Sequence, residues 1–310
     1  MKQQSSICLV FILSIIIPSS AIAKDSFKKV SSFFGAKPYE QVFHKEYILD
    51  EHGALDVTNI NGSIRITTAW NQNKVMLKAI KKAPQEPLLQ QLNVVENYTQ
   101  DNHLVLKTKQ LDEKAKGSID YELLVPATIT LRLETDNGNI EVNHTSGPID
   151  ATTTQGNIHL VNVANTIQAK TEKNGAITIE QPHNTVHASS HKGSITIIDA
   201  CNSIQAETKH GKISVACKEI PSTGSICLES GKGAIELFIP KTTNACIKAR
   251  TAQGKLMSDH FINVNPLLTK LDSNAWERFK KEVDGTIGSG EATIKLSSHY
   301  GNIKILELVS

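Results

Sequence analysis

The chain has 310 residues, with 33 basic and 31 acidic side chains and a formal net charge of +2. This balance gives no indication of a nucleic-acid partner or of an acidic lipid surface. Aromatic residues make up 5% of the chain, which argues against a row of exposed rings of the kind that stacks on sugars or on single-stranded nucleic acids.

Residues 1–23 have the three parts of a secretory signal peptide. Lys2 gives a positive start, residues 7–17 are an apolar run, and Ala21-Ile22-Ala23 is a small-x-small cleavage site. We therefore expect cleavage before Lys24 and an exported protein, located in the periplasm, on the cell surface or in the medium. An uncleaved membrane anchor is the alternative, but the run is short for a membrane span. No later stretch is apolar enough to suggest a transmembrane segment in the mature chain.

Residues 24–45 are expected to be a linker, and residues 46–130 an N-terminal cap that contains a first repeat starting at Leu55. After this repeat come alternating apolar runs, which predict cap strands, and one turn-like or helical segment. A repeat stack needs such a cap because its end strands would otherwise expose unpaired backbone groups. The expected strands lie at 74–80, 92–97, 104–107 and 119–125, with the helical segment at 83–91.

A twelve-residue pattern recurs nine times in the chain: apolar-x-apolar-x-Thr/Ser/Asn-x-x-Gly-x-apolar-x-apolar. Each apolar pair alternates with polar residues, which predicts a short strand with one buried face and one exposed face. The glycine marks a corner between two such strands. The copies start at Leu55, Leu131, Ile149, Ile167, Val186, Ile204, Ile226, Ile247 and Ile294.

Copies of nearly constant length predict an all-β fold, a parallel β-helix or β-solenoid in which coils of 18 or 19 residues stack on one another. Residues 131–310 are assigned to this solenoid, and Ile149, Ile167, Val186 and Ile204 are expected to form one inward column. A Thr or Ser in each copy forms a second column whose hydroxyls can bond the turn backbone. Residues 261–291 interrupt the repeat, and Asp272–Val283 predicts a short C-terminal helix within this insertion.

Four cysteines follow the signal peptide: Cys201, Cys217, Cys227 and Cys246. Cys201 and Cys217 follow the second strands of neighbouring copies and could form a disulfide in an oxidising compartment. Isolated thiols are the alternative. The chain has no CxxC motif, so neither a thioredoxin-like nor a zinc-ribbon site is indicated.

Several segments together resemble a known bacterial family. They are Leu55-Asp56-Val57 with Asn61-Gly62-Ser63-Ile64, the Val125-Pro126 step into the repeats, the segment from Gly285 to Gly290, and the closing Gly301-Asn302-Ile303-Lys304-Ile305. This combination is similar to the β-strand-repeat family known as putative adhesins, a domain-of-unknown-function group related to single-stranded β-helix head domains. The resemblance implies a β-helical fold, export, and an adhesion or envelope role.

The outward columns of the repeat contain no catalytic pattern. The first reads Arg132, Asp150, Gln168, His187, Gln205, Cys227 and Lys248, and the second reads Glu134, Thr152, Lys170, Ser189, Glu207, Glu229 and Arg250. Within them only Glu207 and Glu229 are acidic neighbours, which fits a solvated face better than an acid/base pair. His183, His187 and His191 have the spacing of a helical metal stripe, but strands of period two need not bring them together. We therefore predict no catalytic, cofactor-binding or metal residue and no cofactor.

These features favour a non-catalytic exported scaffold, an adhesin or an envelope-associated binding protein, rather than an enzyme. A cell-surface glycan or an envelope protein would suit its polar faces, whereas no nucleic acid is expected. The alternative is a carbohydrate-active enzyme of β-helix type, a polysaccharide lyase or hydrolase, since several exported β-helix proteins cleave polysaccharides.

Overall fold

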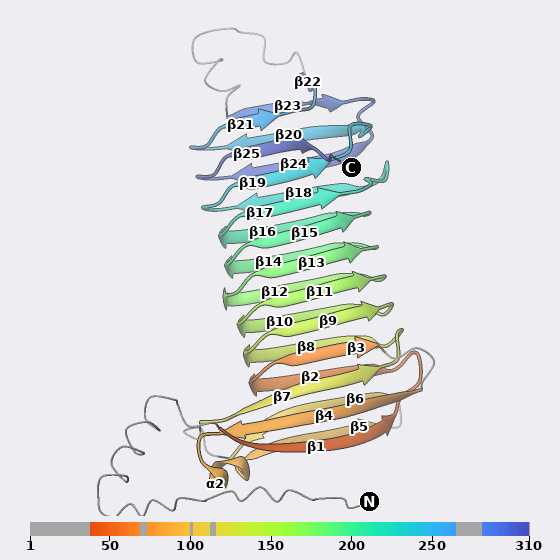
Figure 1. Ribbon diagram of the computed structural model, residues 1–310. Coiled ribbons are helices and arrows are strands. Elements are labelled where there is room, and N and C mark those ends of the chain that lie inside the picture. Colours follow the sequence, from red (N-terminus) through yellow and green to blue (C-terminus); the bar gives the residue numbers. More distant parts are fainter. Residues whose placement is uncertain (1–37, 69–72, 100–101, 112–115, 265–280, 310) are drawn as a thin grey trace, which may run out of the picture. The chain divides into compact units, whose positions relative to one another are not determined.

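The computed structural model describes residues 38–68, 73–99, 102–111, 116–264 and 281–309. Residues Tyr39–Ser310 form one compact unit, which is described here by itself. It consists of a 12-stranded sheet and a 13-stranded sheet whose strands stack along one axis (Figure 1). Among the described residues the one helix is α2 (Glu86–Leu89), and no helix has the length and apolar character needed to cross a membrane. The predicted all-β solenoid is confirmed.

Each central coil is one copy of the sequence pattern folded into two strands. In β10 (Ile149–Gln155) and β11 (Ile158–Val163) alternate residues are buried, as the apolar spacing predicts. The other first strands are β8 (Thr130–Asn137), β12 (Ile167–Asn174), β14 (Val186–Lys192), β16 (Ile204–His210) and β18 (Ser225–Ser230). Their second strands are β9 (Ile140–Thr145), β13 (Ile177–Pro182), β15 (Ile195–Ala200), β17 (Ile213–Cys217) and β19 (Ile235–Ile239).

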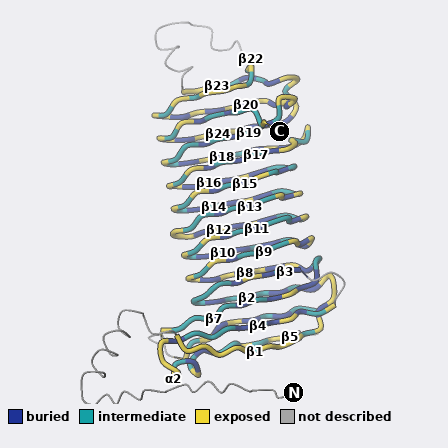
Figure 2. The backbone as a smooth tube through the Cα atoms, in the orientation of Figure 1, coloured by how far each residue is buried: buried dark blue, intermediate teal, exposed yellow. Residues whose placement is uncertain are grey.

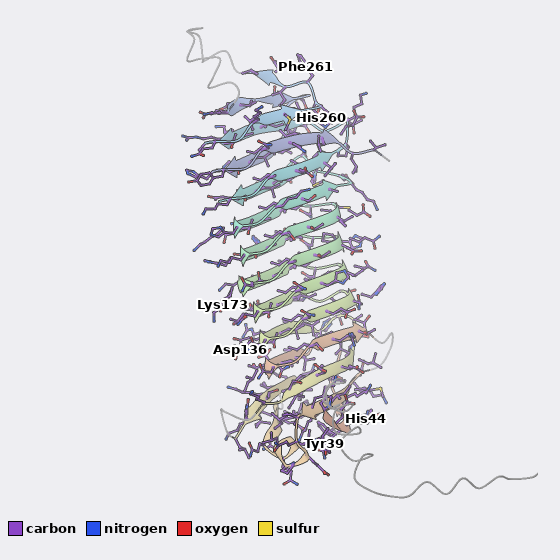
Figure 3. The ribbon with its side chains drawn as sticks, turned by 60° about the vertical axis from the view of Figure 1, so that its left-hand side comes forward. Tyr39, His44, Asp136, Lys173, His260 and Phe261 are labelled. Carbon is purple, nitrogen blue, oxygen red and sulfur yellow. The ribbon has the colours of Figure 1, made fainter. Side chains whose placement is uncertain are left out.

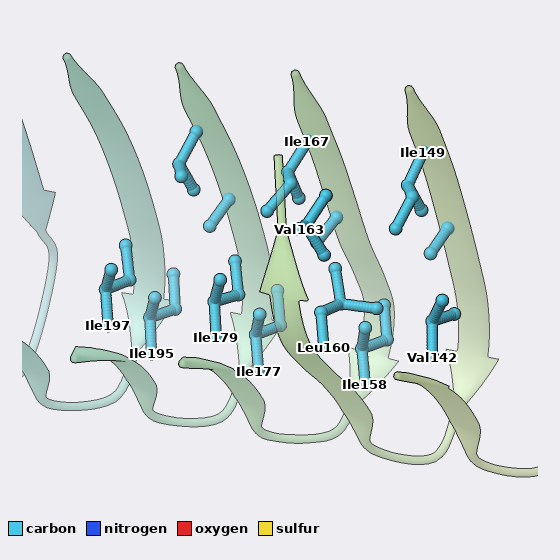
Figure 4. Close-up of a cluster of buried hydrophobic side chains, with 14 of the residues drawn as sticks. Val142, Ile149, Ile158, Leu160, Val163, Ile167, Ile177, Ile179, Ile195 and Ile197 are labelled. Carbon is cyan, nitrogen blue, oxygen red and sulfur yellow. The ribbon is translucent and has the colours of Figure 1, made fainter. Parts of the chain in front are cut away.

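The core is a narrow double row of aliphatic side chains between the two sheets (Figure 4). Ile149 pairs in register with Ile167, Ile167 with Val186, and Val186 with Ile204, which confirms the predicted inward column. All four side chains are at most 2% exposed. Figure 2 shows buried residues along the strands and exposed residues gathered at the turns. Each coil therefore buries its apolar face only against its neighbours and the facing sheet.

The corner between the two strands is a column of glycines in close backbone contact. A Cβ atom on Gly193 would lie 1.8 Å from the carbonyl oxygen of Gly175, and one on Gly211 would lie 2.0 Å from that of Gly193. The buried hydroxyl column lies beside it: Thr208 Oγ1 donates to the carbonyl of Gly193 at 3.1 Å. The expected role of these hydroxyls at the turns is thus confirmed.

At the C-terminal end the coils do not stack in chain order. Strands β24 (Ala292–Ser298) and β25 (Ile303–Glu307) lie between the β18/β19 coil and the coil of β20 (Ala245–Thr251) and β21 (Leu256–Ser258). The glycine column repeats this order, since Gly301 contacts Gly233 on one side and Gly254 on the other. The final repeat is therefore inserted between two coils that are consecutive in the sequence.

The insertion at 261–291 covers the outer edge of β20 with strands. In its described part, β23 (Glu282–Ile287) pairs antiparallel with β20, and β22 (Asn263–Val264) pairs with β23. Residues 272–280 of the predicted helix lie outside the described residues. Val283, expected on that helix, lies instead in β23, where it pairs with Ala249.

The N-terminal cap contains the predicted strands, together with one further coil. The four expected strands are confirmed as β4 (Lys74–Ala83), β5 (Leu92–Thr99), β6 (His103–Gln110) and β7 (Ser118–Val125), and α2 lies in the expected helical segment. Strands β6 and β7 form a coil that pairs in parallel with the first repeat, β2 (Ala54–Asn61) and β3 (Ile64–Thr68). The region was expected to be irregular because this coil has no glycine corner. Ile119 occupies the corner position of this coil, and its carbonyl oxygen lies 2.2 Å from where a Cβ on Gly62 would be. In place of the usual Thr or Ser hydroxyl, Asn59 donates to that carbonyl at 2.8 Å and accepts from Thr108 at 2.7 Å.

The expected linker at 24–45 is wrong at its C-terminal end. Strand β1 (Tyr39–Ile48) begins inside that range and pairs antiparallel with β4 along its whole length. The antiparallel strands β1, β4 and β5 close this end of the stack, as β22 and β23 close the other.

The glycine contact predicts a large stability difference between corner and face positions. Replacing Gly193 or Gly211 by Val places a side chain against the backbone of the next coil, and overpacking of this kind costs about 1–3 kcal/mol of unfolding free energy. Gln205→Ala changes an exposed face residue and should cost within about 0.5 kcal/mol. Urea midpoints of the three variants test this. Equally small effects at all three positions would show that the corner tolerates side chains.

The inserted C-terminal coil predicts a specific cross-link. Cys227 pairs with Lys295, which in turn pairs with Lys248. Paired strands are about 4.8 Å apart and second neighbours about 9.6 Å, whereas a disulfide needs Cα atoms within about 7 Å. Under mild oxidation Lys295→Cys should therefore cross-link to Cys227 and Lys248→Cys should not, as read by peptide mass spectrometry. The reverse result would mean that the coils stack in chain order.

Candidate binding surface

The outward face of the 13-stranded sheet carries a continuous polar column. The backbone register places Lys170, Ser189, Glu207 and Glu229 on successive strands, as the repeat spacing predicts. Above Glu229 the expected order is wrong: Ser297 of the inserted coil follows it, and Arg250 comes only after Ser297. The two acidic neighbours Glu207 and Glu229 are confirmed as register partners.

A groove of about 520 Å³ runs along this column. Ser189 Oγ donates to Glu207 Oε1 at 2.8 Å. Lys170 Nζ lies 2.8 Å from Glu172 Oε1, and this hydrogen bond lowers the pKa of the Glu172 carboxyl below its usual value. Hydroxyl, carboxylate and ammonium groups thus line the groove together. Such a lining can donate and accept several hydrogen bonds along an extended polar ligand.

The arrangement of carboxylates in the groove does not resemble an acid/base pair. Glu207 and Glu229 are both exposed. A general acid in a glycosidase is usually buried among apolar groups, which keep it protonated. No such enclosure surrounds these two side chains, and Glu207 accepts a hydrogen bond from Ser189 on a polar surface.

The three histidines singled out by their spacing do not converge. His183 Nε2 lies 3.0 Å from Asn162 Oδ1, whereas the ring of His191 lies 6.2 Å from that of His210. His187 is in register with Gln168 and Gln205 on the exposed face. Within the part of the chain that the structure describes, no three His, Cys, Asp or Glu side chains form a group that could hold a metal ion.

All four cysteines beyond the first 23 residues are free thiols. Cys217 pairs in the ladder with Ala200, the residue before Cys201, yet no bond joins the two sulfurs. Burial raises the pKa of the Cys217 thiol to about 12. Cys217 is thus an unreactive core residue, and the isolated-thiol alternative describes it.

A second groove, of about 580 Å³, lies on the other sheet near the cap. Met76 and Leu124 give it an apolar floor, and both are more than a third exposed. The ion pair of Lys78 with Glu122, at 2.8 Å, forms part of its lining. This groove is more apolar than the first because the cap strands do not follow the repeat pattern.

Sequence analysis missed a set of basic residues at the glycine corner. We call these residues the basic corner: Lys173, His191, Lys192, Lys209, His210 and Lys232. They lie between the Thr/Ser column and the glycine in four successive coils, at the ends of β12, β14 and β16 and, for Lys232, just after β18. The sequence did contain a signal, a Lys or His between the hydroxyl residue and the glycine in each of these coils. The twelve-residue pattern, however, leaves these positions unspecified. Figure 3 shows Lys173 projecting from the edge of the stack.

Comparison with known proteins identifies the family to which this architecture belongs. Residues 54–306 match the family described as Toastrack DUF4097. No curated protein matches the chain.

Several solved structures are similar to the chain at low sequence identity. A putative adhesin from Parabacteroides distasonis ATCC 8503 has 10% identity and a TM-score of 0.43, over 86% of this chain and 97% of that one. A putative adhesin from Bacteroides fragilis NCTC 9343 has 17% identity and a TM-score of 0.37, over 88% and 100% of the two chains. A putative cell adhesion protein from Clostridium sporogenes ATCC 15579 has 12% identity and a TM-score of 0.29, over 88% and 100%.

Proposed function

The chain belongs to the Toastrack DUF4097 family, and from this premise we propose that it is an exported, non-catalytic binding scaffold, an adhesin or an envelope-associated protein. The observation that carries the proposal is the polar column of the 13-stranded sheet, where Lys170, Ser189, Glu207 and Glu229 face solvent along one groove. These side chains repeat at a fixed spacing on a rigid backbone, which suits recognition of an extended partner.

The scaffold proposal is favoured over catalysis by how the polar groups are engaged. Glu207 accepts a hydrogen bond from Ser189, and Glu172 is paired with Lys170. Both acids are exposed, so water competes for them and no apolar enclosure favours proton transfer. A β-helix carbohydrate-active enzyme remains the second candidate because Glu207 and Glu229 are adjacent in a groove.

A glycan panel separates these two functions. The purified chain is incubated with acidic and neutral polysaccharides, and both bound glycan and released reducing ends or unsaturated sugars are measured. The scaffold proposal expects binding without turnover, and expects Glu207→Gln and Glu229→Gln to leave product formation at background. Turnover by the wild-type chain that either substitution abolishes would replace the scaffold by an enzyme. Binding of no glycan, with capture of an envelope protein instead, would retain the scaffold and change its partner.

Export is the second part of the proposal, and the support for it is the signal-peptide pattern of residues 1–23, which lie outside the described residues. Expression of the full chain in a bacterial host should yield a mature protein beginning at Lys24 in the periplasmic or secreted fraction. Edman sequencing of the purified protein checks the start. Recovery of an uncleaved chain with the membranes would instead indicate an N-terminal anchor.

A further inference from the structure

The basic corner is built from four successive coils, and the segments that carry its residues are hydrogen-bonded to one another. Asn174, next to Lys173, pairs with Lys192, and Lys192 pairs with His210. The amide of Lys232 donates to the carbonyl of Lys209 at 3.1 Å. Coils stack at about 4.8 Å, so cationic side chains leave neighbouring coils close together, with Lys192 in register with His210 rather than with Lys209. Lys173, Lys192, Lys209, His210 and Lys232 are all exposed.

These cations are not neutralised by neighbouring acids. Of the described residues, none forms an ion pair with Lys173, Lys192, Lys209 or Lys232, although the charge of Lys173 helps to lower the pKa of Glu172. In contrast, Lys170 in β12 and the two lysines that flank β17, Lys212 and Lys218, are all paired. The acidic side chain that lies beside the basic corner residues is Glu172, and it already pairs with Lys170. Asp136, which lies near the same end of its strand as Lys173, belongs to a coil two steps below that of Lys173 (Figure 3).

The titration of His210 reflects this accumulation of positive charge. Its pKa is lowered from the usual value, first by desolvation and then by the positive charges of Lys232, His191, Lys192 and Lys209. Four charges from three different coils act on one ring. The charges of three of the four coils are therefore close enough to one another to affect the same ring.

The basic corner is continuous with the polar groove. His191 and Lys209 line the groove together with Ser189, Glu207 and Glu229. A ligand lying along the stack would thus meet ammonium groups on one side and hydrogen-bonding hydroxyls and carboxylates on the other. This combination fits a chain of sugars that bears both hydroxyls and anionic groups.

We propose that the basic corner and the adjoining groove bind a linear acidic polysaccharide, with its carboxylate or sulfate groups on the cationic side chains of successive coils. The inference rests on the proposed binding function and names its ligand class. A step of one coil is close to the length of one sugar in an extended glycan, so successive anionic groups can meet successive coils. Single-stranded nucleic acid fits less well because large stacking platforms for bases are scarce. Among the described residues beside the corner, Tyr300 lies 6.0 Å from Lys232 Nζ, and the other rings are the small imidazoles of His191, His210 and His299.

Two triple variants with the same loss of charge test this site. The first replaces Lys192, Lys209 and Lys232 by Gln. The control replaces three exposed lysines on other parts of the unit by Gln: Lys107, Lys109 and Lys295. Binding is measured by calorimetry against heparin, polygalacturonate, neutral dextran and oligo-dT, at two salt concentrations. Circular dichroism and urea midpoints confirm that both variants are folded.

The wild-type chain should bind heparin or polygalacturonate, bind more weakly at higher salt, and not bind dextran. Three exposed charge contacts together are worth about tenfold in affinity, so the corner variant should lose on the order of tenfold and the control much less. An equal loss in both variants would show that net charge alone is responsible. Tighter binding of oligo-dT than of either acidic glycan would overturn the choice of ligand.

The failure of this inference is distinguishable from failure of the proposed function. If the chain binds dextran or an envelope protein but neither acidic glycan, the basic corner is not the site and the scaffold remains. If the chain cleaves an acidic glycan, the scaffold itself is replaced by an enzyme, whatever the corner variant binds.

Discussion

The contact between successive glycine corners is the constraint on which the rest of the stack depends. At each corner the carbonyl of one coil lies where a side chain of the next would begin, within 2.0 Å for a Cβ on Gly211. The same carbonyl, on Gly193, accepts a hydrogen bond from the buried hydroxyl of Thr208. Glycine therefore permits the close approach of the two backbones. The hydroxyl gives the corner carbonyl, which this approach buries, a hydrogen-bond donor. Both recur at one place in the regular coils, where the corner glycines from Gly138 to Gly211 are 18 or 19 residues apart. Between Gly211 and Gly233 the spacing is 22 residues, and the longer connection between β17 and β18 accommodates the difference without moving the corner.

This constraint explains why the register could be predicted from the sequence and the order of the coils could not. The column from Ile149 to Ile204 follows from spacing alone, because each coil repeats the same corner and the same apolar pairs. For the same reason every coil offers its neighbours an equivalent edge, and the spacing contains no information about which copy comes next. Strand β24 fits between β18 and β20 because all three carry the same pattern. The β6/β7 coil was missed because Ile119 rather than glycine stands at its corner, and because Asn59 replaces the Thr or Ser hydroxyl that elsewhere bonds the corner carbonyl.

The candidate site was predictable only in part, because outward residues are not constrained by packing. Once the register was known, Lys170, Ser189, Glu207 and Glu229 were correctly aligned, since they alternate with buried residues on regular strands. The basic corner lies mostly at the ends of first strands, at positions that the repeat pattern leaves unspecified. Between Thr171 and Asn174 the ladder shifts register, so that Lys173 is displaced relative to the turn residues of the next coil. The repeat pattern therefore gives no reason to group the residues of the basic corner, whereas the structure brings them to one edge of the stack.

A rigid stack also determines how a surface of this kind can bind. Single contacts between exposed charges are weak, so a useful affinity requires several contacts made at once, and each added coil contributes more of them at the same spacing. The backbone ladder holds Lys192 and His210 at that spacing before any ligand arrives, which reduces the ordering cost of binding to the side chains themselves. The corner glycines and the buried hydroxyls keep the coils in place whatever the outward residues are. Stability and recognition thus depend on different positions of one repeat, and the exposed positions are free to set the ligand without altering the fold.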